Sequence, residues 1–141
     1  MERIRIVCLT LFTFIFMSSG ALFANEPISM STLVTTQNVS FEMCNKIFNI
    51  PAEKLFYLSI AGINANRFQI DEIQSKTGYI LFTAVNKQFL ASVVKVDSTK
   101  SILKITPTNN LYYFPPGIVL NIFKYIEVNE NTPVSPISQK S

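Results

Sequence analysis

The chain has 141 residues and a formal net charge of +3, from 12 Lys and Arg against 9 Asp and Glu. Its lysines are spread singly along the sequence, whereas nucleic-acid binding requires a concentrated basic stripe, so we expect no nucleic-acid partner. The sequence contains no histidine and only two cysteines, which removes the commonest general base and the usual zinc ligands. We therefore expect no cofactor, no metal and no enzyme activity.

Residues 1–24 have the pattern of a secretory signal peptide. Arg3 and Arg5 give a positive start, residues 6–17 form an apolar run, and small residues follow. The apolar run is too short to cross a bilayer core of roughly 30 Å without strain. Cleavage after Ala24 is favoured slightly over cleavage after Ala21, and the alternative is an uncleaved membrane anchor. Cys8 precedes most of the apolar run, which argues against a lipoprotein.

The segment of residues 25–37 is polar and Ser/Thr-rich, and we expect a flexible lead-in there. A single domain is predicted for residues 38–128, beginning with a strand whose Val39, Phe41 and Met43 share one face. Once the leader is removed, Cys44 is the remaining cysteine, so an intrachain disulfide is excluded. We favour a buried, apolar role for Cys44 over a reactive thiol.

The rest of the predicted domain consists of a helix, four strands and a second helix. Pro51 suits the first turn of a helix that runs to about Ala65. Strands are predicted by alternation and separated by short turns, with a bulge near Asp71 and Glu72 in the first of them. The predicted strands are residues 67–74, 79–85, 88–96 and 101–106. A helix over 118–128 and a disordered, proline-bearing tail over 129–141 complete the chain.

This order of elements predicts an α+β fold. Turns of two to four residues favour an antiparallel meander of four to five strands, with one helix before it and one after it. Both helices on one face of the sheet give a two-layer sandwich. The other face also carries apolar residues, so either the sheet curls around the helices or that face meets a partner. These residues are Leu81, Val85, Leu90 and Val94.

Two groups of residues could carry chemistry or binding. Asp71 and Glu72 are adjacent, and on a regular strand they point to opposite faces, which favours a charged edge over a catalytic pair. Tyr112, Tyr113 and Phe114 precede the rigid run 115–117 and could form an aromatic ledge for a partner. The competing interpretation, which we favour, is that Tyr112 and Phe114 close the end of the core.

The stretch from Pro51 to Phe82 has a helix, an apolar strand with Phe68 and Ile70, a polar turn ending in Gly78, and a second strand. This pattern resembles the helix-grip domains of small bacterial envelope proteins, such as the BamC-like lipoproteins of the outer-membrane assembly machinery. The resemblance implies an α+β fold and a scaffold-type role. It assigns no functional residue.

We therefore expect an exported, periplasmic or extracellular bacterial protein that binds an envelope protein or peptide through its sheet or through the ledge. One alternative is a carrier of an apolar small molecule, held between the sheet and the first helix. A second alternative is an enzyme that uses Cys44. No stable membrane span is expected once the leader is cleaved.

Overall fold

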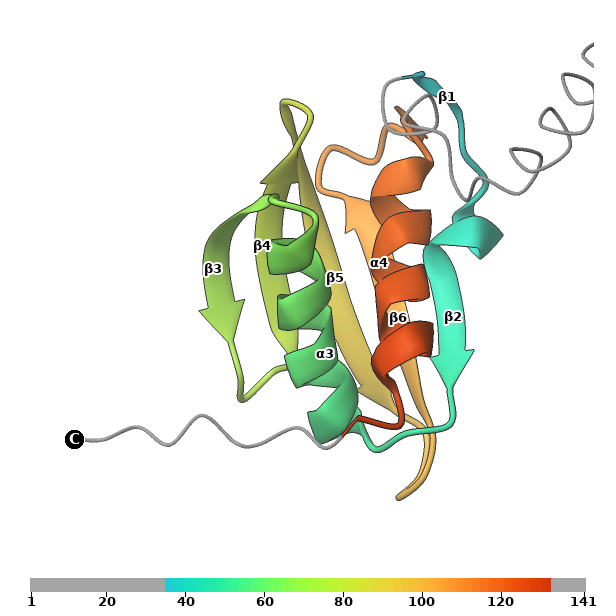
Figure 1. Ribbon diagram of the computed structural model, residues 1–141. Helices are drawn as coiled ribbons and strands as arrows, with labels where there is room; N and C mark the ends of the chain where they lie inside the picture. The colour runs from blue at the N-terminus through green and yellow to red at the C-terminus, as the bar shows by residue number, and fades with distance from the viewer. Residues whose placement is uncertain (1–34, 133–141) are drawn as a thin grey trace, which may run out of the picture. The chain divides into compact units, whose positions relative to one another are not determined.

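Figure 1 shows the computed structural model, which describes residues 35–132. The predicted signal peptide of residues 1–24 lies outside the described residues. So do residues 25–34 of the predicted lead-in and residues 133–141 of the predicted tail.

The domain is built on a five-stranded antiparallel sheet in the order β2-β6-β5-β4-β3. Strands β3, β4, β5 and β6 form a meander. The remaining strand of this sheet, β2, pairs with β6. A second, two-stranded sheet joins β1 to β7. The bounds are β1 Gln37–Asn38, β2 Asn45–Phe48, β3 Gln69–Gln74, β4 Tyr79–Ala84, β5 Lys87–Lys95, β6 Ser101–Pro107 and β7 Tyr113–Phe114.

Helices α3 (Ala52–Ala65) and α4 (Gly117–Asn129) both cover one face of the large sheet, as Figure 1 shows. The predicted α+β architecture, with one helix before the strands of the meander and one after them, is confirmed. The two helices also contact each other. They approach closely at Gly62, where an added Cβ would lie 3.2 Å from Cδ1 of Tyr125. Helix α4 therefore provides the second cover that the broad apolar surface of α3 requires.

The core lies between the helices and the sheet. Buried residues alternate along β4 and β6, as expected for a sheet with one covered face. Stacked rings of Phe68, Phe82 and Phe89, together with the edge of Phe114, run through this layer. The largest fully buried side chains also include Leu55, Ile63, Ile80, Leu103, Ile105, Ile118, Ile122 and Ile126.

The first predicted strand is wrong in position. Residues Phe41–Cys44 form a 3-10 helix, and the strand begins only at Asn45. The predicted common face of Val39, Phe41 and Met43 is also wrong, since Phe41 and Met43 are 51% and 43% exposed, while Val39 is buried. In a short segment, alternating apolar residues do not distinguish a strand from a tight helical turn followed by a strand.

Element boundaries elsewhere differ from the prediction by one or two residues. The turn between β4 and β5 is Val85–Asn86 rather than Asn86–Lys87, because Ala84 pairs with Lys87. Strand β1 begins at Gln37, within the predicted lead-in, and α4 continues to Asn129, one residue into the predicted tail. The predicted bulge is confirmed between Ile70 and Glu72.

Candidate functional site

The three aromatic residues of the predicted ledge have different environments. Phe114 is 1% exposed, and its ring meets the ring of Phe89 edge-on at 5.0 Å. Tyr112 is half-buried beside Phe41, at 6.1 Å between ring centroids. Tyr113 is 58% exposed. The structure therefore places Phe114 in the core, and Tyr113 is the most exposed residue of the three.

Lys87 holds the segment before Phe114 in place. Its Nζ donates to the carbonyl oxygens of Leu111 and Tyr113, at 2.5 and 3.3 Å, and lies 5.6 Å from the centre of the Phe114 ring. The backbone N–H of Val39 donates to the carbonyl oxygen of Tyr112, which ties the start of the domain to the same segment. We call the exposed part of this region, Phe41, Leu111, Tyr112 and Tyr113, the aromatic end.

Cys44 is completely buried, and its thiol donates to the carbonyl oxygen of Ser40 at 3.6 Å. Burial raises the pKa of this thiol to about 11, because the charged thiolate loses its hydration in the protein interior. A nucleophilic cysteine requires an accessible thiolate. The geometry therefore agrees with the favoured interpretation of Cys44 as a packing residue.

The bulge in β3 brings Asp71 and Glu72 to the same face of the sheet. Asp71 accepts hydrogen bonds from Thr83 at 2.6 Å and from Gln88 at 3.4 Å. The side chains of Thr83 and Gln88 point away from the helices, because the neighbouring Phe82 and Phe89 are buried. Glu72 pairs with Leu81, which points the same way. On a regular strand the two side chains would point to opposite faces, but the extra residue of the predicted bulge shifts the alternation by one position.

The face of the large sheet that points away from the helices, here called the outer face, is rich in apolar side chains. One row across the strands is Ile47, Ile102 and Val94, and another is Leu90 and Leu81. Between these rows lie Tyr79, Ser92 and Lys104. Ile47, Tyr79 and Val94 are 63%, 43% and 41% exposed.

The sequence had indicated only part of this outer face. Leu81, Leu90 and Val94 follow from the alternation of β4 and β5. Alternation along β6 also places Ile102 on the outer face, because its neighbour Leu103 is buried. The outward position of Ile47 could not be predicted, because the first strand was predicted in the wrong place.

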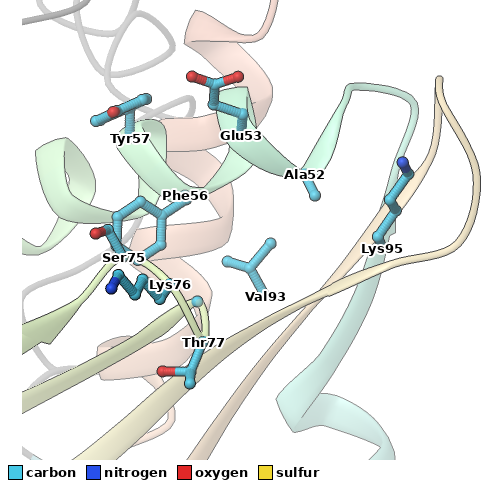
Figure 2. A pocket seen from close by; sticks show the side chains of 10 residues that line it. Ala52, Glu53, Phe56, Tyr57, Ser75, Lys76, Thr77, Val93 and Lys95 are labelled. Atoms are coloured by element: carbon cyan, nitrogen blue, oxygen red, sulfur yellow. The ribbon is translucent and has the colours of Figure 1, made fainter.

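An open groove lies between the start of α3, the turn between β3 and β4, and the end of β5. Its volume is about 440 Å³, within the range of ligand-binding clefts. Figure 2 shows the side chains around it. The lining residues are Ala52, Glu53, Phe56, Tyr57, Ser75, Lys76, Thr77, Gly78, Val93 and Lys95. Sequence reasoning missed this groove because three segments distant in sequence form it.

Comparison with protein families, characterised proteins and solved structures finds no match to this chain. Within residues 35–132, no helix is both long and apolar enough to cross a membrane. In the same part of the chain, no three acidic or cysteine side chains gather in a way that would hold a metal ion. The fold and the surfaces described above are therefore the basis for a functional proposal.

Proposed function

We propose that this protein is an exported, non-enzymatic module of the bacterial envelope, and that it binds another envelope protein through the outer face of its sheet. The observation that carries the proposal is the apolar outer face, on which Ile47, Tyr79 and Val94 are all more than two-fifths exposed. A gathering of exposed apolar side chains on one face is typical of interaction sites.

The charges on the outer face indicate the chemistry of the partner. Asp71 and Glu72 lie at one flank, on the edge strand β3, and Lys104 lies on β6, with Leu81 and Leu90 between them. Opposite charges across an interface fix its register and suppress wrong partners. The partner is a protein whose contact surface is apolar at its centre, with a basic group opposite β3 and an acidic group opposite Lys104.

Export by a cleaved signal peptide is part of the same proposal. The support is the order of charge, apolar run and small residues in positions 1–24. N-terminal sequencing of the protein recovered from the periplasm or the medium tests it. The expected sequence begins at Asn25, or at Leu22 if Ala21 precedes the cut, and an intact Met1 on a membrane-bound product contradicts it.

Site-specific photo-crosslinking tests the binding surface. A photoreactive amino acid replaces Val94 on the outer face or, as the control, Val128 on α4, which is 70% exposed. We expect a discrete adduct with a second envelope protein from position 94 and none from position 128. The change Ile47→Lys should reduce the adduct severalfold while altering the stability by no more than about 0.5 kcal/mol, because Ile47 is exposed.

Three results contradict the proposal. Equal adducts from both positions mean non-specific contact, and an adduct of the protein with itself means a homo-oligomer. Absence of any adduct at position 94 removes the outer face as a binding site. In that case an adduct from position 113 instead supports the aromatic end, and the variant Tyr112→Ala/Tyr113→Ala should then weaken capture.

The structure offers less to the other two hypotheses. The space between α3 and the sheet is filled by buried side chains such as Leu55, Phe82 and Ile80, which leaves little room for an apolar cargo there. A Cys44-dependent enzyme requires a reactive thiol, whereas this one is buried with a raised pKa. Rapid alkylation of Cys44 in the folded protein would restore that hypothesis.

A further inference from the structure

The groove beside α3 is a second potential binding site, on different residues from the outer face, and its walls are fixed by the fold. The backbone N–H of Val93 donates to the carbonyl oxygen of Gly78 at 3.0 Å, which fastens the β3–β4 turn to β5. Gly78 has a φ of +73°, and a Cβ there would lie 3.0 Å from the carbonyl oxygen of Val93. On the opposite wall, α3 is anchored in the core through Leu55. The groove is therefore preformed.

The inner part of the groove is apolar. Phe56 is 7% exposed and Val93 is half-buried, so both present carbon surface at its base. Figure 2 shows Val93 between the α3 residues and the turn residues. Ala52 leaves space beside them because its side chain is a single methyl group. An aromatic or branched aliphatic group is the chemistry that this base would accept.

The rim of the groove has an excess of positive charge. Lys76 comes from the turn and Lys95 from β5, and neither takes part in an ion pair among the described residues, where the pair found is Lys46 with Glu127. Ala52 and Glu53 of the first turn of α3 also line the groove, and Pro51 gives this turn no side-chain cap. Glu53 is the one acidic residue of the lining, and Figure 2 shows its carboxylate pointing away from Val93.

We propose that this groove binds the carboxylate end of an apolar ligand, with the apolar group on Phe56 and Val93 and the carboxylate at the rim, where Lys76 and Lys95 supply positive charge from opposite sides. Two sources share this chemistry: the C-terminal residue of a peptide, and a free aromatic or aliphatic acid. The groove is open on one side, so the preceding residues of a peptide have a path out. Figure 2 shows Lys76 and Lys95 on opposite sides of Val93, so the two positive charges flank the apolar base.

Nuclear magnetic resonance titration of the exported, isotope-labelled protein tests the proposal. The first probe is the blocked peptide acetyl-Ser-Gly-Ser-Gly-Phe with a free C-terminal carboxylate, and the second is the same peptide as its C-terminal amide. The third probe, 3-phenylpropionate, distinguishes a free acid from a peptide end. We expect saturable shifts of the amides of Ala52, Thr77 and Gly78 with the carboxylates, and at least about tenfold weaker binding of the amide.

Matched variants separate the cations from the apolar base. Lys76→Gln and Lys95→Gln should each weaken binding of the carboxylate peptide about two- to fivefold, as expected for partly solvated ion pairs. Lys124→Gln, on the exposed surface of α4 and outside the groove lining, is the charge-matched control and should leave the affinity unchanged. Ala52→Leu fills the groove at constant charge and should also weaken binding.

The proposal is overturned by equal affinities of the acid and the amide, by shifts centred away from the groove, or by no saturable binding of any probe up to about 1 mM. It is overturned equally if Lys124→Gln weakens binding as much as the two groove variants, because the effect is then one of net charge. None of these results bears on the outer face, which shares no residue with the groove.

Discussion

Cys44 is the residue whose environment has the clearest consequence in solution. Its ordinary pKa of 9.0 rises to about 11 on burial, so the fold favours the neutral thiol. The neighbouring Tyr112 also has a raised pKa, first through its own desolvation and then through the charge that Cys44 would carry. The two groups therefore oppose each other's ionisation at the same end of the core.

The raised pKa makes the stability of the protein depend on pH in the alkaline range. Between about pH 9 and pH 11 the unfolded chain loses the Cys44 proton and the folded chain keeps it, so the free energy of unfolding falls as pH rises. The contribution is fully present below pH 9 and amounts to about 2–3 kcal/mol over the whole interval. Urea unfolding of the wild type and of Cys44→Ala, at several pH values, measures it.

The Cys44→Ala variant is the control, because its pH dependence of the unfolding free energy is subtracted from that of the wild type. The other titratable groups are the same in both proteins, so the difference between the two slopes belongs to Cys44 and to its coupling with Tyr112. Identical slopes in the two proteins would show that the thiol ionises as freely in the fold as in the unfolded chain. Fast reaction of the native wild type with a thiol reagent at pH 8 would lead to the same conclusion.

At the scale of elements, the hairpin between β4 and β5 contains an unfavourable residue. Val85 and Asn86 form its two-residue loop, with φ angles of +49° and +59°. These angles are typical of a type I′ turn, which suits the twist of the paired strands. Asparagine tolerates positive φ, but a β-branched residue such as Val85 does not. The strain is therefore concentrated at one position of the turn.

Replacing Val85 by asparagine should stabilise the protein. Val85 is 54% exposed, so its side chain contributes little packing that the change would remove. We expect Val85→Asn to raise the free energy of unfolding by about 1 kcal/mol, measured as a shift of the urea midpoint at constant m-value. Val94→Asn, in the extended β5 strand, is the control and should not stabilise. A destabilised Val85→Asn would mean that the valine makes contacts that offset its strain.

The elements that could be predicted from the sequence are those with a sustained periodic pattern. Helix α3 and the strands β4, β5 and β6 follow from repeated apolar positions, and the bulge follows from the phase change at Ile73. The prediction of a strand around Phe41 and Met43 was wrong because the alternation there spans only a few residues. The pairing of β2 with β6 joins Lys46 to Leu103, and no local pattern specifies a contact over such a distance.

The same distinction separates the two proposed sites. The outer face was foreseen in part because it repeats along single strands, at positions such as Leu90 and Val94. The groove was not foreseen because Phe56, Lys76 and Lys95 meet only through the tertiary fold. Its one sequence signal is Gly78, whose positive φ marks a turn that closely approaches the neighbouring strand.

At the scale of the whole molecule, a continuous line of aromatic rings connects parts of the chain that are distant in sequence. Phe68 stacks on Phe82 at 6.0 Å, Phe82 on Phe89 at 5.5 Å, and Phe114 completes the line. The line joins the end of α3 to the segment before α4. Cys44 is the one cysteine in residues 35–132, so no disulfide supports this region within the described chain and packing must hold it together.

Substitutions at the adjacent residues Tyr113 and Phe114, at the end of the line of aromatic rings, distinguish a role in the core from a role in binding. Phe114→Ala removes a side chain that is 1% exposed and should lower the free energy of unfolding by about 3–5 kcal/mol, a large fraction of the stability of a small domain. Tyr113→Ala changes an exposed neighbour and should alter it by less than about 0.5 kcal/mol. Urea unfolding of both variants gives the two values. Similar losses would place Tyr113 in the packing of the folded state, and a negligible loss for Phe114→Ala would mean that the line of rings does not hold β7 to the sheet.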